Sequence, residues 1–439
     1  MSASDVVAHD ELRGSHVVSV AARLDGRPLI STRNLLSWLW MILLLGFVVP
    51  STIHGTSRSG ISMYEWGAMV CVIVLVILVS ARLASRAAVL FGVLVAFVPW
   101  FVTWLRGDQF SHPAIVTGVN FVLLGALYCI PMKTAPSHLV RRIVLPLAEV
   151  FLALCAIGVV FHMPAADRWL ISWYGQYYDA LVPTMVAAGK PVGVFGTHSV
   201  SAFAYYLLAF YHTRTYEKSG SMTALLCACF WLIVIGFLSS GTAAAAVLVG
   251  VADIVGTSVR RDRHSVRWLA AGAVVVACVI GLARIGQLRE PSGGGLIVRI
   301  WGNNVNGLLA RYGTNTGVVS QLLTYFRAHP FSPIGLTDAA SVDPSLAGQI
   351  IGDVGPVNYL LRGGLVLLCS VYAGLWLFLQ SAIGNRRTAV WLWFITLAFE
   401  LGFSMLDTPR LLLLMTIVVI SLGDLYRSSS MSHATPGEP

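Results

Sequence analysis

The sequence predicts an all-α, polytopic membrane protein, and three observations support this fold class. Of its 439 residues, 56% are hydrophobic and only 11% are charged, and the mean hydropathy is +0.76. Long apolar runs recur along the chain, and a run of about 20 residues can cross a bilayer as a helix. Basic residues gather in alternate connecting loops. This combination excludes an ordinary soluble globular domain.

About twelve apolar segments approach the length of a spanning helix, and they make one membrane domain over residues 35–427. The sixth segment is the shortest, and only a tight break at Ser239–Thr242 separates the seventh from the eighth. We expect a polar tail over 1–34 without a cleavable signal peptide, and a disordered tail over 428–439. The expected spans are 35–53, 65–81, 87–105, 115–131, 143–162, 199–212, 222–240, 241–257, 269–285, 356–380, 390–405 and 411–426.

The net charge of +9 would fit nucleic-acid binding, but its distribution argues against that class. Lysine and arginine are concentrated before the first span and then in every second loop, which is the positive-inside pattern. The pattern places both termini in the cytoplasm. It makes 163–198 and 285–356 the two large extracytoplasmic loops.

The sequence contains no motif for a nucleotide, dinucleotide or metal cofactor. There is no Walker P-loop, no HExxH pair, no dinucleotide fingerprint and no paired Asp-x-Asp. All seven cysteines lie inside expected spans, so we also expect no structural disulfide. We therefore expect no cofactor, and a transferase of this kind would use an outward, lipid-borne donor.

The first large loop contains five aromatic residues whose spacing fits a helix lying at the membrane interface. The alternative is a platform on which sugar rings stack. His198, at the mouth of the sixth span, is either a local cap or a second contact for a glycan. The aromatic residues are Trp169, Trp173, Tyr174, Tyr177 and Tyr178.

The second large loop is rich in arginine and contains no lysine. One arginine at the surface would snorkel to headgroups or pair with an acid. Four are harder to explain in this way, and the planar guanidinium suits forked recognition of phosphate. We expect at least two of them to bind pyrophosphate. They are Arg289, Arg299, Arg311 and Arg327.

Two short helices are expected in this loop, over 296–312 and 315–328. The second ends at His329, because a residue before proline is pushed out of helical geometry. His329 is the best candidate for a general base, since a neutral imidazole can accept a proton from a sugar hydroxyl. A capping role at the helix end is the alternative, and Asp343 and Asp338 are the other candidate bases.

Three carboxylates lie within expected spans, where an ionisable side chain is costly and is a candidate for function. Glu149 and Glu400 are either proton-relay groups of a transporter or structural partners of Arg362 or Arg410; structural pairing is favoured. Asp253 is expected to pair with a basic residue of the neighbouring loop.

Four segments, in their order and topology, resemble the bacterial O-antigen polymerase and O-antigen ligase superfamily. The resemblance covers roughly residues 185–380. The segments are 189–198 leading into a span, 236–243 between two spans, 325–330 followed by Ile334-Gly335, and Asp343 followed by Gly352-Asp353-Val354-Gly355.

The resemblance implies a fold like that of C-type glycosyltransferases. It implies glycan transfer from undecaprenyl pyrophosphate at the outer face of the inner membrane, with the pyrophosphate bound by arginines that match Arg299, Arg311 and Arg327 here. Ligases of the superfamily carry a loop histidine before a Gly-x-x-Gly, where this chain has Ser341 and Val342. That departure favours the polymerase branch.

We therefore expect a polymerase that joins lipid-linked oligosaccharide units into a surface polysaccharide or exopolysaccharide. Acceptor sugars are expected at His198, Trp173 and Tyr177. The expected partners are the lipid-linked substrate and the bilayer, and the family adds a chain-length regulator and a flippase. The alternatives are a ligase that transfers finished glycan, and a secondary transporter or flippase using Glu149 and Glu400.

Overall fold

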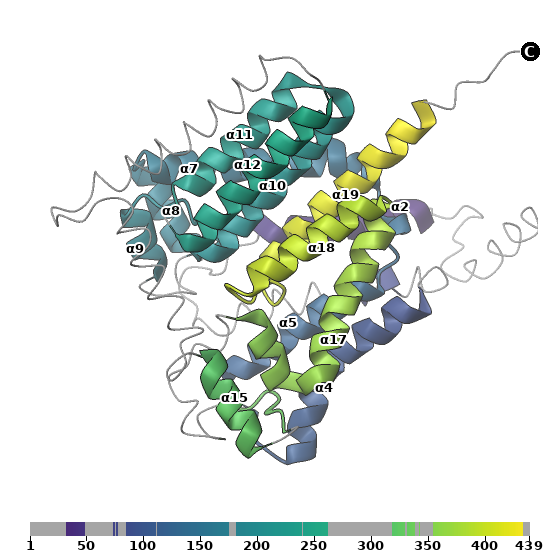
Figure 1. The fold of residues 1–439 in the computed structure, drawn as a ribbon, viewed down its shortest axis with the longest axis vertical. Coiled ribbons are helices and arrows are strands. Elements are labelled where there is room, and N and C mark those ends of the chain that lie inside the picture. Colours follow the sequence, from purple (N-terminus) through teal and green to yellow (C-terminus); the bar gives the residue numbers. More distant parts are fainter. Residues whose placement is uncertain are drawn as a thin grey trace, which may run out of the picture.

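The fold is helical throughout the part of the chain that the computed structural model describes (Figure 1). That part comprises residues 32–48, 73–74, 76–77, 85–110, 112–174, 181–238, 240–261, 318–329, 332–338, 342 and 354–432. No strand occurs in these ranges, which confirms the all-α class.

Described helices lie over ten of the twelve expected spans. The expected spans 65–81 and 269–285 lie largely or wholly outside the described residues, so the number twelve stays a prediction. The helices are α2 (Thr32–Leu45), α4 (Arg86–Arg106), α5 (His112–Cys129), α6 (Ser137–Leu139), α7 (Leu145–Val160), α8 (Pro164–Tyr174), α9 (Leu181–Ala187), α10 (His198–Ser219), α11 (Met222–Gly236), α12 (Gly241–Arg261), α15 (Val318–Ala328), α17 (Gly355–Ile383), α18 (Arg386–Glu400) and α19 (Pro409–Ser432).

Among the described residues, five helical segments are long and apolar enough to cross a membrane. Three shorter apolar helices accompany them: Asn34–Val48, Ile115–Cys129 and Met222–Gly236. The chain is therefore consistent with a helical membrane protein. The five segments are Arg86–Arg106, Ser137–Val160, Gly241–Ser258, Gly355–Ile383 and Pro409–Ser428.

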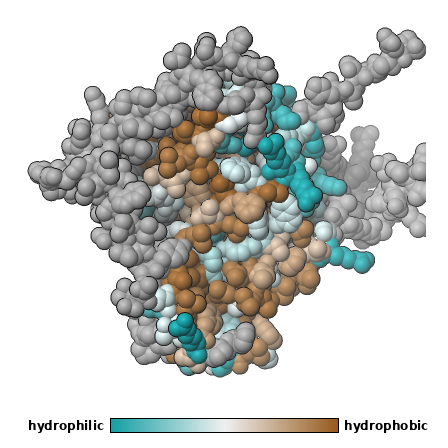
Figure 2. Space-filling model, in the orientation of Figure 1, coloured by the Kyte–Doolittle hydropathy of each residue, from teal (hydrophilic) through white to brown (hydrophobic). Residues whose placement is uncertain are grey.

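The outer faces of these helices are apolar, as expected of a surface in contact with lipid. On α4, Phe97 and Trp104 are 60% and 69% exposed, and on α7 Leu154 is 65% exposed. Figure 2 shows a broad hydrophobic surface with hydrophilic residues towards its edges. Burial of such side chains in a bilayer replaces the burial in a core that a soluble protein would need.

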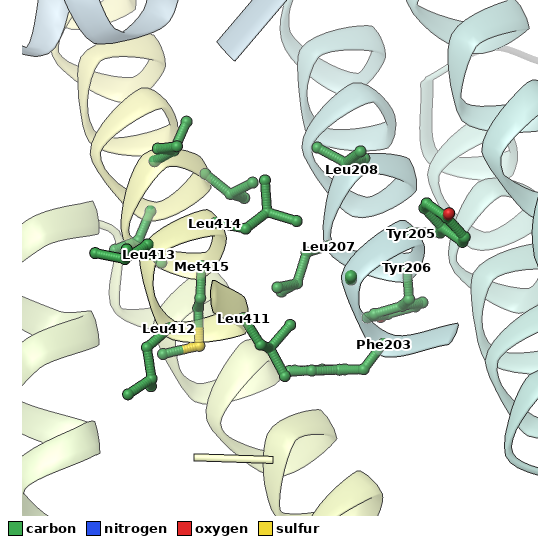
Figure 3. Packing of buried hydrophobic residues seen from close by; sticks show 14 of the residues in the cluster. Phe203, Tyr205, Tyr206, Leu207, Leu208, Leu411, Leu412, Leu413, Leu414 and Met415 are labelled. Carbon is green, nitrogen blue, oxygen red and sulfur yellow. The ribbon is translucent and has the colours of Figure 1, made fainter. Parts of the chain in front are cut away.

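The centre of the fold is formed by α10 and α19, whose side chains pack against each other (Figure 3). The sixth expected span, 199–212, was too short: α10 has 22 residues and continues to Ser219. Its side chains are buried on every side from Ser199 to Tyr211. Because protein rather than lipid surrounds α10, its serine, threonine and tyrosine residues can bond to neighbours, and hydropathy alone underestimates its length.

Small residues allow two helices near the surface to approach closely. A Cβ atom added to Gly92 of α4 would lie 2.4 Å from the carbonyl oxygen of Gly125 on α5. A Cβ atom on Gly374 of α17 would lie 2.4 Å from the ring of Tyr128. Small residues at such crossings are typical of helices packed within membranes, where close contact supplies the attraction.

The turns between helices gather at two ends of the bundle. At the first, Ser199 of α10 bonds to Thr242 of α12 at 3.2 Å, and Asn358 of α17 bonds to Asp407, before α19, at 2.9 Å. We call this the Glu400 end. It holds the N-termini of α10, α12, α17 and α19 and the C-terminus of α18.

The opposite end is marked by Asp424 near the C-terminus of α19. Arg141 donates to Asp424 at 3.1 Å, and Thr388 at the start of α18 bonds to Tyr426 at 2.7 Å. We call this the Asp424 end. By the charge distribution in the sequence, it is the end expected to face the cytoplasm.

Candidate functional site

The candidate site lies at the Glu400 end, where α15 and the 332–338 segment meet α4 and α17. Arg106 at the end of α4 donates to the Ser332 hydroxyl at 2.9 Å and to the Pro333 carbonyl at 3.4 Å. The Tyr325 hydroxyl of α15 donates to the Ser332 carbonyl at 2.8 Å. These bonds join α15 to the membrane helices.

Helix α15 (Val318–Ala328) confirms the second helix expected in the arginine-rich loop, and residues 315–317 of that prediction lie outside the described residues. It ends at Ala328, as the following His329 and Pro330 predict. Tyr325 is buried, whereas Arg327 and His329 are exposed. The His329 ring lies 5.1 Å from the Tyr325 ring. Both predicted site residues are therefore accessible to a ligand at this end.

Arg362 positions the segment that carries Asp338. One terminal nitrogen of this half-buried arginine on α17 donates to the carbonyl oxygens of Gly335 and Thr337, both at 2.8 Å. Gly335 has φ +64°, and a Cβ atom there would lie 2.3 Å from the Thr103 hydroxyl. Only glycine fits this turn. The turn leaves Asp338 exposed within the electrostatic influence of Arg362.

Asp407 is the second carboxylate near Arg362. It accepts a hydrogen bond from the Asn358 amide at 2.9 Å. Burial raises the pKa of Asp407 to about 7, although its hydrogen bonds and the nearby Arg362 favour the charged form. A carboxyl group with this pKa exchanges protons near neutral pH. Asp407 is thus a titratable group of the candidate site that the sequence did not single out.

Glu400 is fully buried and does not bind the arginine that the sequence predicted. Its carboxylate accepts from the Tyr359 hydroxyl at 2.8 Å and from the Met405 and Leu406 amides at 2.6 and 2.7 Å. The expected ion pair with Arg362 or Arg410 is wrong, because the chain turns back after α18 and brings its own amides to the carboxylate. Glu400 therefore shapes the turn that precedes α19.

An apolar cavity of about 510 Å³ lies between α15, Pro333 and α17. Phe326 of α15 forms part of its wall, and Gly363 to Val366 of α17 form another part. Gly364 has φ +66° and ψ −160°, which interrupts the helical geometry of α17 at this point. Leu365 and Val366 are 60% and 55% exposed. The cavity therefore adjoins the lipid-facing surface and lies within one helical turn of Arg327.

Helix α8 confirms that part of the predicted aromatic loop is helical, and its position at the membrane interface stays a prediction. Trp173 is 39% exposed and Tyr174 is 2% exposed. The Tyr174 hydroxyl donates to the Val48 carbonyl at 2.6 Å, and Arg410 lies 5.2 Å from the Tyr174 ring. Trp173 can contact a ligand, whereas Tyr174 is a core residue.

His198 is the first residue of α10, and its neighbour Thr197 is the residue that caps the helix. Arg410 at the start of α19 donates to the Val194 carbonyl at 3.4 Å in the segment before α10. Arg410 thus contacts the segment that precedes His198 and the residue that follows Trp173. This group lies at the Glu400 end, as do Arg327, His329 and Asp338.

Four predicted site residues, Arg299, Arg311, Asp343 and Tyr177, lie outside the described residues. Within the described part of the chain, no three His, Cys, Asp or Glu side chains are placed to hold a metal ion. The sequence predicted Arg362 and Arg410 only as partners of buried acids. The signal that marks them is an arginine inside or at the mouth of an apolar span, which is a candidate for function in its own right.

No protein family, curated protein or solved structure matches this chain. The functional assignment therefore depends on the residues of the candidate site and on the sequence resemblance described above.

Proposed function

We propose that this protein polymerises lipid-linked oligosaccharide units at the outer face of the bacterial inner membrane. The glycan would leave a polyprenyl pyrophosphate and join a sugar hydroxyl of a second lipid-linked unit. The observation that carries the proposal is the apolar cavity between α15 and α17, whose wall includes Phe326, the residue that precedes the exposed Arg327 in α15. This arrangement fits a ligand with a long apolar tail and a charged head.

The chemistry makes two demands on such a site. The bond between the sugar C1 and the pyrophosphate oxygen breaks, so negative charge grows on the leaving group. A new bond forms between C1 and the acceptor oxygen, whose proton must go to a base. Arginines offset the growing charge without a metal, and this electrostatic contribution is large where water is excluded.

Residues of this chain can be assigned to each demand. Arg327, together with Arg299 and Arg311 of the same loop, would bind the pyrophosphate. His329 would accept the proton, with Asp338 or Asp343 in its place if histidine is dispensable. His198, Trp173 and Tyr177 would hold the acceptor sugars. Hydrogen bonds from Arg362 keep the segment carrying Asp338 in position.

Reconstitution tests the polymerase assignment. The purified protein in liposomes with a polyprenyl-pyrophosphate repeat unit should produce a ladder of multimers on a gel. Arg327→Ala should lower the yield by about 100-fold, as the loss of one transition-state donor typically does. Arg142→Ala, an exposed arginine at the Asp424 end, is the matched control and should keep the ladder. A ladder of unchanged yield in Arg327→Ala would rule out this site.

The same assay separates the polymerase from the ligase. A ligase would transfer one glycan to a different acceptor and would give a single product instead of a ladder. Adding candidate acceptors to a folded preparation that makes no ladder would identify that activity.

A proton-coupled transporter is the second candidate, and one contact favours it. Glu149 of α7 lies 2.6 Å from the Nε2 atom of His212 on α10, and both side chains are largely buried. Such a pair within membrane helices is typical of a proton relay. Substrate uptake that depends on a proton gradient, is abolished by Glu149→Gln and is unaffected by Arg327→Ala would replace the polymerase assignment.

A further inference from the structure

A second cavity lies at the Asp424 end, far along the helices from the candidate site. Its volume is about 470 Å³, and it is formed by the last turns of α10, the second half of α12, the first turn of α18 and Tyr426 of α19. None of the residues assigned to glycan transfer lines it. The cavity thus requires a separate explanation.

The charged residues of this cavity leave a positive excess. Arg214 pairs with Glu217 at 2.6 Å and with Asp253 at 2.5 Å, so its two terminal nitrogens are engaged by both acids. In the described part of the chain, neither Lys218 nor Arg387 lies within ion-pair distance of a carboxylate. Two cations therefore face the cavity without an acidic partner there.

Two buried donors in the wall lack an acceptor. Arg214 is 7% exposed and Thr257 is 2% exposed. The Nε atom of Arg214 and the hydroxyl of Thr257 have no hydrogen-bond partner within the described residues. Both side chains line the cavity. Buried polar groups nearly always form hydrogen bonds. Two buried donors without an acceptor beside one cavity therefore indicate a ligand that accepts hydrogen bonds.

The N-terminus of α18 adds positive potential at the same place. Asn385 caps this 15-residue helix through a bond to the Thr388 amide at 3.0 Å. The amides of Arg386 and Arg387 precede the first intrahelical bonds and remain available as donors. A helix N-terminus with such donors favours an anion.

We propose that this cavity binds a phosphate-bearing anion. Cations, a helix N-terminus and unpaired donors together match the several acceptor oxygens of a phosphate group. The anion could come from a phospholipid headgroup or from a soluble phosphate. Trp391, which lines the cavity and is 40% exposed, favours the lipid, because tryptophan prefers the headgroup region of a bilayer.

Melting temperatures of the purified full-length protein in detergent test the proposal. Phosphatidylglycerol should raise the melting temperature of the wild type, and zwitterionic phosphatidylcholine at the same concentration should raise it less. The double variant Lys218→Gln/Arg387→Gln should bind phosphatidylglycerol about thirtyfold more weakly, since each cation near a membrane surface contributes about a factor of five. Thr257→Val should reduce binding less.

Each comparison uses the shift caused by the ligand, not the melting temperature itself, because Lys218 also lies in the last turn of α10, where it offsets the helix dipole. Arg142→Gln is the control and should keep the full shift. A shift with phosphatidylglycerol but not with inorganic phosphate identifies the lipid as the source, and the reverse identifies a soluble phosphate. Equal shifts in the double variant, the control and the wild type would overturn the proposal.

Discussion

The two ends of the bundle hold their charges in different ways. At the Asp424 end, Asp424 and Asp253 form salt bridges with Arg141 and Arg214. At the Glu400 end, Glu400 and Asp407 accept from amides and a hydroxyl, and Arg362 donates to backbone carbonyls. A salt bridge neutralises its partners, whereas a bond to a neutral group leaves the charge available. The acids of the Asp424 end are therefore offset by their arginines, whereas Glu400, Asp407 and Arg362 are held by groups without a net charge.

The largest effect is expected for Glu400→Ala, which removes the acceptor of two backbone amides and of the Tyr359 hydroxyl. The free energy of unfolding should fall by about 3 kcal/mol or more, because each buried donor left unpaired costs about 1–3 kcal/mol. Thermal unfolding in detergent measures this. Glu400→Gln keeps an acceptor oxygen and should lose much less. Equal losses in both variants would show that the carboxylate charge, and not hydrogen bonding, matters.

Arg362→Ala should cost about 2 kcal/mol, because the carbonyl oxygens of Gly335 and Thr337 would lose a charged donor. It should also reduce product yield, since the segment with Asp338 would lose its support. Arg362→Lys should recover part of the stability, but it should not reproduce the geometry of the two hydrogen bonds to the Gly335 and Thr337 carbonyl oxygens. Unfolding and the ladder assay together measure both effects. A fully stable, fully active Arg362→Ala would remove this residue from the site.

Asp407 should make stability depend on pH. Its folded pKa of about 7 lies above the usual value of about 3.9 in an unfolded chain. The folded state therefore binds more protons between about pH 4 and 7, and its stability should fall as pH rises through this window. Melting temperatures across the window measure the slope. Asp407→Asn, which cannot titrate, should flatten it, and an unchanged slope would assign the effect to another group.

The smallest effect is expected at the Asp424 end. Arg141 and Asp424 are 28% and 18% exposed, so their salt bridge is partly screened by solvent. Arg141→Ala should lower the free energy of unfolding by at most about 1 kcal/mol, with a smaller loss at high salt. Arg142→Ala should have no measurable effect. If Arg141→Ala lowered the free energy of unfolding as much as Glu400→Ala does, the proposed difference between the Asp424 end and the Glu400 end would be wrong.

Several elements could be predicted because their cause is local. Helix α15 ends where the sequence places a histidine before a proline, and α8 follows the aromatic spacing of the first loop. The partners of buried acids could not be predicted, because they come from distant segments. Asp253 does find a basic partner, and it is Arg214 of α10, 39 residues away in sequence. Glu149 pairs with His212, which is 63 residues away.

The sequence by itself determined the helical membrane class, the positions of most helices and the presence of a polar, arginine-containing segment over residues 285–356. Hydropathy, charge alternation and proline act within a few residues, so they can be read directly. Only the tertiary structure decided that Asp407, Arg362 and Asp338 share one end, and that an apolar cavity adjoins α15. These juxtapositions depend on helix packing, in which residues far apart in sequence meet because close-packed surfaces must fit.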